Sequence, residues 1–280
     1  MSPTGSRRRL DQELVERRLV ASRNEAQQLV GAGRVLVSGV IAEKPSRLVA
    51  RAEPVVIVTP RRFVSRGGEK LDAALTGFSV DPADRLCLDA GASTGGFTDC
   101  LLQRSARRVV SVDVGHGQLA EQLRTNPRVF AVDRCNVRYA DISDLGGDFF
   151  EVVVADLSFI SLTVVADKLA VDLAKAGADL VMLVKPQFEA GNTEAGRTEV
   201  NRGHGVVRDP EIWTECLVRV GNAFEASGAA IMGVMASPLV GPAGNVEFLM
   251  HALTATPPGD TPLESLVVGA IEHAPTGPEH

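Results

Sequence analysis

The chain has 280 residues, of which 45% are hydrophobic and 23% are charged, proportions that are usual in globular proteins. No run reaches the roughly 18 uncharged apolar residues of a membrane-spanning helix. The arginines at positions 7–9 precede no apolar segment of the kind found in secretion signals. We therefore expect a cytoplasmic protein, and the length favours two domains.

The formal net charge of −6 is distributed unevenly. Residues 1–62 hold 12 Lys and Arg against 6 Asp and Glu, and the remainder has a net charge of −12. A basic front segment favours a polyanion such as RNA as partner, although basic surfaces are also common in proteins that bind no nucleic acid. The four cysteines lack a CxxC spacing, which predicts reduced thiols and no metal site.

The first 60 residues predict a small α+β unit. Apolar spacing over 10–30 predicts two short helices with an interruption near 20–22. Ser22 and Glu25 form a capping-box pattern for the second helix, and Gly31 and Gly33 follow it. Short β-prone runs come next, at 35–37, 40–41 and 55–58.

From about residue 85 the chain predicts an α/β, Rossmann-like fold with a seven-stranded, mostly parallel sheet, because β-prone runs alternate with helical segments. The candidate strands are 86–89, 109–113, 129–132, 152–156, 180–184, 229–235 and 246–251. Segment 192–209 has no apolar period and predicts a functional loop. A Pro- and Gly-rich stretch after 254 predicts a partly disordered tail with one helix at 263–272.

The sequence LCLDAGASTGG at 86–96 predicts a nucleotide-type binding turn. Asp89 ends the apolar strand, and Gly91, Gly95 and Gly96 lead into a helix; glycine allows a ligand to approach the backbone closely. The spacing departs from GxGxxG, and an acid two residues before the first glycine suits the ammonium of a methionine moiety better than a pyrophosphate. The alternative is a tight structural turn with capping or surface acids.

Acids at two neighbouring strand ends favour S-adenosylmethionine over that alternative. Asp113 ends the second strand, where a carboxylate accepts hydrogen bonds from ribose hydroxyls. Asp133 and Asn136 follow the third strand and could meet the adenine. The full set of cofactor-binding candidates is Asp89, Gly91, Ala92, Ser93, Thr94, Gly95, Gly96, Phe97, Asp113, Asp133, Asn136 and Asp156.

Methyl transfer to a hydroxyl requires an in-line approach and a base, but no metal. A lysine can act as base where burial or another cation favours its neutral form, because the reference pKa is ~10.4. Lys185 follows the apolar run LVMLV and Asp156 ends VVVAD, so both fall at the sheet edge where such folds bind ligands. Lys70 and Glu247 are further candidates. The alternatives are solvent charges for Lys70 and Glu247 and a structural ion pair for the other two.

The whole chain resembles the TlyA family, whose members are named both hemolysins and ribosomal RNA 2′-O-methyltransferases and whose catalytic half is similar to FtsJ/RrmJ methyltransferases. The resemblance is carried by VSRGGEKL (64–71), LDAGASTGGFT (88–98), VDVGHGQLA (112–120), VADLSFISL (154–162), LVKPQFE (183–189) and GNVEF (244–248). It implies S-adenosyl-L-methionine as cofactor and cytidine riboses of 16S ribosomal RNA, 23S ribosomal RNA or both as substrates. It also implies a link to capreomycin and viomycin susceptibility.

The same resemblance implies a catalytic tetrad of Lys70, Asp156, Lys185 and Glu247. In that family a Lys-Asp-Lys-Glu set performs ribose 2′-O-methylation. Lys185 would deprotonate the 2′-hydroxyl, the two acids would hold the lysines, and Lys70 would orient the ribose.

Segments 9–15 and 22–39 are similar to the RNA-binding domain that ribosomal protein S-four shares with RNA-modifying enzymes. The residues expected to meet phosphates are Arg8, Arg9, Arg17, Arg18, Arg23 and Arg34, with Arg66 in the second domain. RRFV at 61–64 matches the family's interdomain linker, except that Phe63 replaces the usual tryptophan. The expected domains are 1–59 (S-four-type), 60–64 (linker), 65–254 (methyltransferase) and 255–280 (tail).

Three other functions remain to be weighed. A base N-methyltransferase usually carries Pro-Pro-aromatic after strand four to grip a flipped base, whereas residues 156–159 read Asp-Leu-Ser-Phe. A membrane-active hemolysin is disfavoured by the absence of a signal, a spanning segment and a basic amphipathic helix. An RNA-binding scaffold without catalysis would require a displaced tetrad, and all four residue types are present. We expect a monomer that acts on ribosomal subunits.

Overall fold

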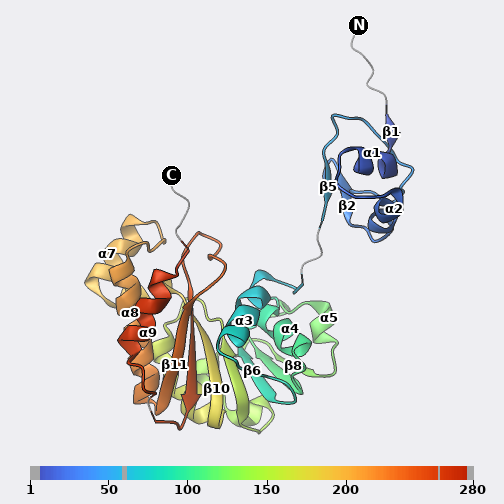
Figure 1. Cartoon of the computed structure of the whole chain (residues 1–280). Coiled ribbons are helices and arrows are strands. Elements are labelled where there is room, and N and C mark those ends of the chain that lie inside the picture. The colour runs from blue at the N-terminus through green and yellow to red at the C-terminus, as the bar shows by residue number, and fades with distance from the viewer. Residues whose placement is uncertain (1–6, 59–61, 258, 276–280) are drawn as a thin grey trace. The chain divides into compact units, whose positions relative to one another are not determined.

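The computed structural model describes residues 7–58, 62–257 and 259–275. The chain forms two compact units, residues 1–61 and 62–280 (Figure 1). Each unit has its own hydrophobic core. Among the described residues, no helix has both the length and the apolarity needed to cross a membrane.

The first unit is a small α+β domain whose helices lie where the apolar spacing predicts them. Its elements are β1 (Arg8–Arg9), α1 (Leu10–Glu16), α2 (Arg23–Gly31), β2 (Val35–Val37), β3 (Val40–Ile41), β4 (Leu48–Val49) and β5 (Val55–Ile57). The predicted cap of α2 is present, because Ser22 Oγ accepts a hydrogen bond from Glu25 N at 3.2 Å. The Glu25 carboxylate accepts one from Ala21 N in return. Strands β3, β2 and β5 form an antiparallel sheet, and β1 pairs with β4.

The second unit contains one seven-stranded sheet in the order β11-β12-β10-β9-β6-β7-β8. Its strands are β6 (Leu86–Ala90), β7 (Arg108–Val112), β8 (Val129–Val132), β9 (Phe150–Ala155), β10 (Ala174–Val184), β11 (Ala229–Ala236) and β12 (Phe248–Thr254). Strand β12 is antiparallel to β10 and β11, and the other pairs in β10-β9-β6-β7-β8 are parallel. The Rossmann-like methyltransferase fold predicted from the sequence is therefore confirmed.

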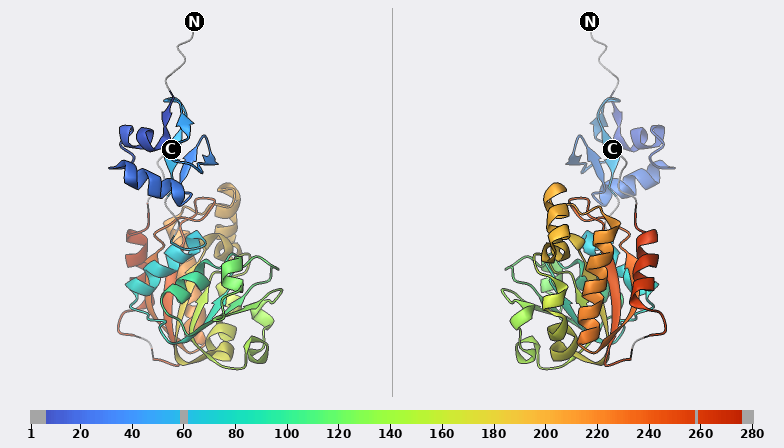
Figure 2. Two further views of the ribbon diagram at one scale, coloured as in Figure 1. Left: turned by 90° about the vertical axis from the view of Figure 1, so that its right-hand side faces the viewer. Right: turned by 90° about the vertical axis from the view of Figure 1, so that its left-hand side faces the viewer.

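Helices cover both faces of this sheet (Figure 2). One face carries α3 (Arg66–Gly77), α4 (Gly96–Gln103) and α5 (Glu121–Arg124), and the other carries α8 (Pro210–Ala226) and α9 (Leu263–Glu272). Successive residues of β6 alternate between the two cores, with Leu88 and Ala90 on one side and Cys87 on the other. Burial on both faces explains why the strands read as continuous apolar runs.

Two segments differ from the sequence-based expectation. Segment 192–209 is partly helical, because it contains α7 (Glu194–Arg202), which is capped by Thr193: Thr193 Oγ1 accepts a hydrogen bond from Gly196 N. Most of the side chains of α7 are polar and exposed, so the sequence of this segment lacks the apolar spacing from which a helix is predicted. Residues 263–272, expected within a tail, form α9, and this helix belongs to the core: Leu263, Val267 and Ala270 are buried. The last residues of the expected tail, 276–280, lie outside the described residues.

We expect Val267→Ala to lower the free energy of unfolding of the second unit by about 2 kcal/mol, because it removes two buried methyl groups and leaves a cavity. The matched control is Val268→Ala, since Val268 is 51% exposed and its loss should change stability by less than about 0.5 kcal/mol. Denaturant titration measures both values. Equal effects of the two variants would contradict the packing of α9 into the core.

Candidate functional site

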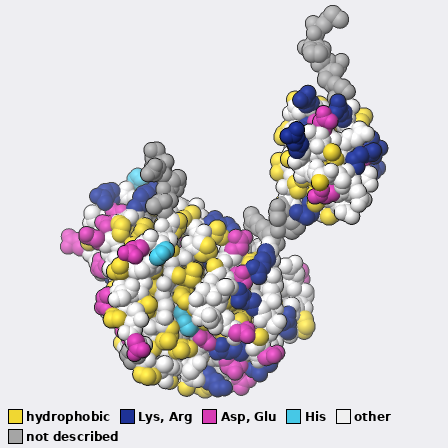
Figure 3. All heavy atoms as spheres, viewed as in Figure 1, with side chains coloured by type: hydrophobic (Ala, Val, Ile, Leu, Met, Phe, Trp, Pro, Cys, Tyr) yellow, Lys and Arg dark blue, Asp and Glu magenta, His cyan; other side chains and the backbone are white. Residues whose placement is uncertain are grey.

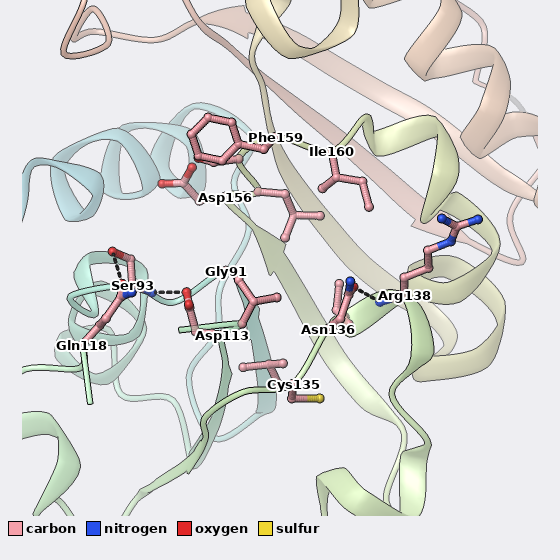
Figure 4. Close-up of a pocket in the computed structure, with 15 residues that line it drawn as sticks. Gly91, Ser93, Asp113, Gln118, Cys135, Asn136, Arg138, Asp156, Phe159 and Ile160 are labelled. Atoms are coloured by element: carbon pink, nitrogen blue, oxygen red, sulfur yellow. Dashed lines mark hydrogen bonds between the residues drawn. The ribbon is translucent and has the colours of Figure 1, made fainter. Parts of the chain in front are cut away.

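A pocket of about 630 Å³ lies at the carboxyl ends of β6, β7 and β9 (Figure 4). Its walls combine backbone from the glycine turn, the ends of β7 and β8, and the loop that follows β9. The lining residues are Gly91, Ser93, Val112, Asp113, Val114, Gln118, Cys135, Asn136, Val137, Arg138, Asp156, Leu157, Ser158, Phe159 and Ile160. In the described part of the chain, no group of three or more His, Cys, Asp or Glu side chains could hold a metal ion.

The glycine turn requires glycine at position 91. Gly91 has a φ of +89°, and a Cβ added there would lie 2.5 Å from the carbonyl oxygen of Asp156. The turn is held by Asp113, whose two carboxylate oxygens accept hydrogen bonds from Ser93 N (2.8 Å) and Gly115 N (2.6 Å). Ser93 itself has a φ of +47°. Backbone in such conformations is costly without a compensating partner, and Asp113 supplies one.

Five of the predicted cofactor residues line the pocket: Gly91, Ser93, Asp113, Asn136 and Asp156. Several lining residues were not predicted, among them Gln118, Cys135, Arg138 and the stretch 157–160. Their residue types alone do not indicate a cofactor site. The available signal was position, because each of these segments follows a strand that ends at this edge.

The other predicted cofactor residues do not line the pocket; they are Asp89, Ala92, Thr94, Gly95, Gly96, Phe97 and Asp133. Gly96 serves helix packing, since a Cβ there would meet Ser65 Oγ at 2.1 Å. Asp133 accepts a hydrogen bond from Gly117 N and contacts Arg124. The Gly117 hydrogen bond lowers the pKa of Asp133. The Asp133 carboxylate therefore stabilises the turn that follows β7.

Asp89 is fully buried behind the glycine turn. Its Oδ2 accepts a hydrogen bond from Thr98 Oγ1 at 2.6 Å, and its Oδ1 has no hydrogen-bond donor among the described residues. Burial raises the pKa of this carboxyl to about 7. A carboxyl with such a pKa changes its charge near neutral pH.

The four predicted catalytic residues form two ion pairs at the same edge of the sheet. Lys70 Nζ, on α3, donates to Glu247 Oε2, and both side chains are buried. Lys185 Nζ lies 2.6 Å from Asp156 Oδ1. The strand register brings the pairs to this edge: Val184 at the end of β10 pairs with Phe248 at the start of the antiparallel β12.

The Lys185 amine has well-defined surroundings. It donates a hydrogen bond to Ser158 Oγ at 3.0 Å, and it lies 5.8 Å from the centre of the Phe188 ring. Asp156 and Ser158 also line the pocket. The amine is therefore held beside the pocket by two groups that form its wall.

Lys and Arg side chains gather over the first unit (Figure 3), and one buried carboxylate organises two of them. Asp11 is inaccessible to solvent. It accepts two hydrogen bonds from the Arg9 guanidinium (3.1 and 3.0 Å) and one from Arg23 (2.9 Å). The Arg9 hydrogen bonds lower the pKa of Asp11 well below its usual range. Both arginines remain about half exposed and are held side by side.

The remaining predicted RNA contacts differ in their availability. Arg17 is an internal brace, because its guanidinium binds Glu13 and the carbonyl oxygens of Ala50, Arg51 and Glu53. These internal contacts occupy the guanidinium, so Arg17 is less available to a phosphate than the half-exposed Arg9 and Arg23. Of the others, Arg8 pairs with Glu16, Arg34 donates to Val58 O, Arg66 donates to Val240 O, and Arg18 is exposed.

Comparison with known proteins agrees with this architecture. A family model described as FtsJ-like methyltransferase matches residues 63–253, and the S4 domain model matches residues 8–54. The 16S/23S rRNA (cytidine-2′-O)-methyltransferase TlyA of Mycobacterium tuberculosis is 46% identical over 252 residues, which span 89% of this chain and 91% of that protein.

Two further relatives carry a different name. Hemolysin A of Brachyspira hyodysenteriae is 35% identical over 243 residues, or 87% of this chain and 98% of that protein. A solved structure of a candidate hemolysin from Streptococcus thermophilus is similar with a TM-score of 0.70 and 36% identity, and it covers 95% of this chain and 96% of that chain.

We expect Asp89→Asn to be more stable than the unmodified protein above neutral pH. The folded-state pKa of Asp89 is raised, so its contribution to stability is full below its unfolded pKa near 4 and is lost as pH rises through about 7. Asparagine is neutral throughout and can still accept from Thr98. The difference in the free energy of unfolding between the variant and the unmodified protein, called the gap below, should grow between pH 4 and 8, to at most about 4 kcal/mol. Denaturant titrations at several pH values test this, and a gap that is independent of pH would contradict it.

Proposed function

Because the chain belongs to the TlyA family, with an FtsJ-like methyltransferase domain behind an S4 domain, we propose that it methylates the 2′-hydroxyl of cytidine in 16S and 23S ribosomal RNA. The observation that carries this proposal is the Lys185–Asp156 contact beside the pocket, with the Lys70–Glu247 contact at the same edge of the sheet. An amine held at the rim of a cofactor pocket suits proton removal from a ribose hydroxyl.

S-adenosyl-L-methionine is the cofactor of this family, and the pocket residues fit it. Gly91 lines the pocket with backbone alone, because a side chain at this position would collide with the Asp156 carbonyl. Asp113 and Asn136 offer oxygen acceptors at the ends of adjacent strands, where ribose and adenine groups would be held. When bound, the cofactor supplies an electrophilic methyl group.

We assign proton removal to Lys185. In its neutral form the Nζ would accept the proton of the 2′-hydroxyl and become an ammonium paired with Asp156, while Asp156 and Ser158 hold the group at the pocket. Positioning a base and a nucleophile together removes much of the entropic cost of the reaction. Lys70, fixed by Glu247, would orient the ribose from the α3 side.

An exposed aromatic ring beside the pocket supports a nucleic-acid substrate. Phe159 is 90% exposed and packs on Phe188 with ring centres 5.0 Å apart. Unstacked RNA bases are commonly held on aromatic side chains. The paired arginines of the first unit, Arg9 and Arg23, would bind phosphates and set the position of the protein along the RNA.

We place this activity in the cytoplasm, with ribosomal subunits as partners and the protein as a monomer.

We expect Lys185→Ala to abolish methyl transfer while the protein still binds S-adenosylhomocysteine, because the base is lost and the pocket wall remains. The measurement is tritiated-methyl transfer to purified 30S and 50S subunits. Lys175→Ala is the matched control, since Lys175 lies near the start of β10, at the opposite end from Lys185, and its side chain is 63% exposed. Unchanged label in the Lys185 variant would exclude it as the base.

The same assay separates the proposed function from its alternatives. Label on neither subunit, from a protein that binds S-adenosylhomocysteine, would contradict ribosomal RNA as substrate and favour a binding scaffold. Label on a base rather than a ribose, read by nuclease digestion and chromatography, would contradict 2′-O-methylation.

We expect Arg9→Ala combined with Arg23→Ala to raise the Kd for ribosomal subunits and to reduce the salt dependence of binding by about one unit of slope per arginine. Arg17→Ala should instead lower the Tm of the first unit, because it breaks internal contacts. Binding isotherms at several salt concentrations, with thermal melts, measure both. An unchanged salt slope in the double variant would contradict phosphate binding by this pair.

A further inference from the structure

Lys185 and the single helical turn that follows it, α6 (Pro186–Glu189), together contact the pocket loop 156–162 at three points. Lys185 contacts Asp156 and Ser158 at the start of the loop. Phe188 packs on Phe159 in its middle. Glu189 binds its far end.

Glu189 makes the third contact through a buried carboxylate. The residue is 1% exposed; Oε2 accepts a hydrogen bond from Ser161 Oγ at 2.5 Å, and Oε1 accepts one from Leu162 N at 2.8 Å. Its own carbonyl oxygen accepts from the Arg219 guanidinium of α8 at 2.5 Å. Burial raises the pKa of this carboxyl. A buried acid costs stability unless it is well bonded, and here both carboxylate oxygens accept hydrogen bonds from the loop.

The loop held by Glu189 forms one side of the pocket. Residues 157–160 all line it, and Figure 4 shows Phe159 and Ile160 on the same side as Asp156. Phe159 has a φ of +66°, a conformation that a bulky residue keeps only when its surroundings determine it. The contacts before and after Phe159 both come from the segment 185–189.

We propose that Glu189 is a positioning residue for methyl transfer. By fixing Ser161 and Leu162, it holds the loop in the conformation that closes the cofactor pocket and presents Ser158 to the Lys185 amine. The cofactor part of this role depends only on the pocket. The part that concerns the rate rests on the proposed function.

Two substitutions separate positioning from simple packing. Glu189→Leu keeps most of the volume but removes both acceptors, and it leaves Leu162 N buried without a partner. Glu189→Gln can keep both contacts, because its oxygen accepts from Leu162 N and its amide donates to Ser161 Oγ, whose proton then goes to Thr163 Oγ1, 2.6 Å away. Glu151→Leu is the control: Glu151 also accepts a backbone hydrogen bond, from Leu86 N, but near the opposite end of β9.

The experiment measures the Kd for S-adenosylhomocysteine by calorimetry without RNA, and kcat and KM for methyl transfer to ribosomal subunits. We expect Glu189→Leu to raise the Kd about tenfold and to lower kcat. Glu189→Gln should remain within about threefold of the unmodified protein in both. Glu151→Leu should lower the Tm without changing the Kd or kcat of the folded protein.

A folded Glu189→Leu protein with unchanged Kd and kcat would overturn the proposal, whatever its Tm. If that variant does not fold, Ser161→Ala tests the same contact from the loop side, and an unchanged Kd there would overturn it equally. The two proposals fail separately. An unmodified protein that labels no ribosomal subunit overturns the proposed function, while the Kd measurements still decide the role of Glu189.

Discussion

The contact between Lys185 and Asp156 joins the ends of two adjacent strands, β10 and β9, which are buried over residues 180–184 and 152–155. Parallel pairing of these strands brings their last residues to one edge, where a charge must find a partner. The second Lys–carboxylate contact depends on the same edge. Strand β12 runs in the opposite direction, so its first residues, rather than its last, lie beside Lys185. This reversal allows Glu247 to reach Lys70.

The cofactor turn is tied to this edge through backbone rather than through charge. The Asp156 amide donates to Ala90 O, and the Asp156 carbonyl lies where a side chain at position 91 would be. A shift of Asp156 would therefore disturb the pocket and the Lys185 amine together. Segment 185–189 braces the loop from the other side. The pocket wall and the base are thus supported by one set of contacts.

The first unit follows a different physical rule, because its charges lie at a surface. One buried carboxylate, Asp11, holds Arg9 and Arg23 with their guanidinium groups partly exposed. The pair keeps a net positive charge in a defined geometry, which lowers the entropy lost on binding a phosphate. Arg17, which follows the other end of α1 from Arg9, instead donates hydrogen bonds to carbonyl oxygens within the unit. Counting arginines therefore overestimates the basic surface.

The sequence by itself determined the two-part organisation, the alternation of helices and strands, and the edge at which the chemistry lies. These features follow from local periodicity and from residue type at strand ends, which need no knowledge of distant partners. Asp156, Lys185, Asp113 and Gly91 could be found in this way. The helix over 194–202 could not, because its exposed surface carries no apolar period.

Only the tertiary structure decided which charged side chains are available to a ligand and which are paired within the protein. Asp133 and Arg17 look like binding residues in the sequence, yet both are occupied by partners that come from other elements. Glu189 has no signal beyond its place after Lys185, and its role arises from Ser161 and Leu162, far from it in the chain. Hydrogen bonds between distant segments depend on the packing of the sheet and its helices. The pattern of residues along the chain does not show which distant segments will form these hydrogen bonds.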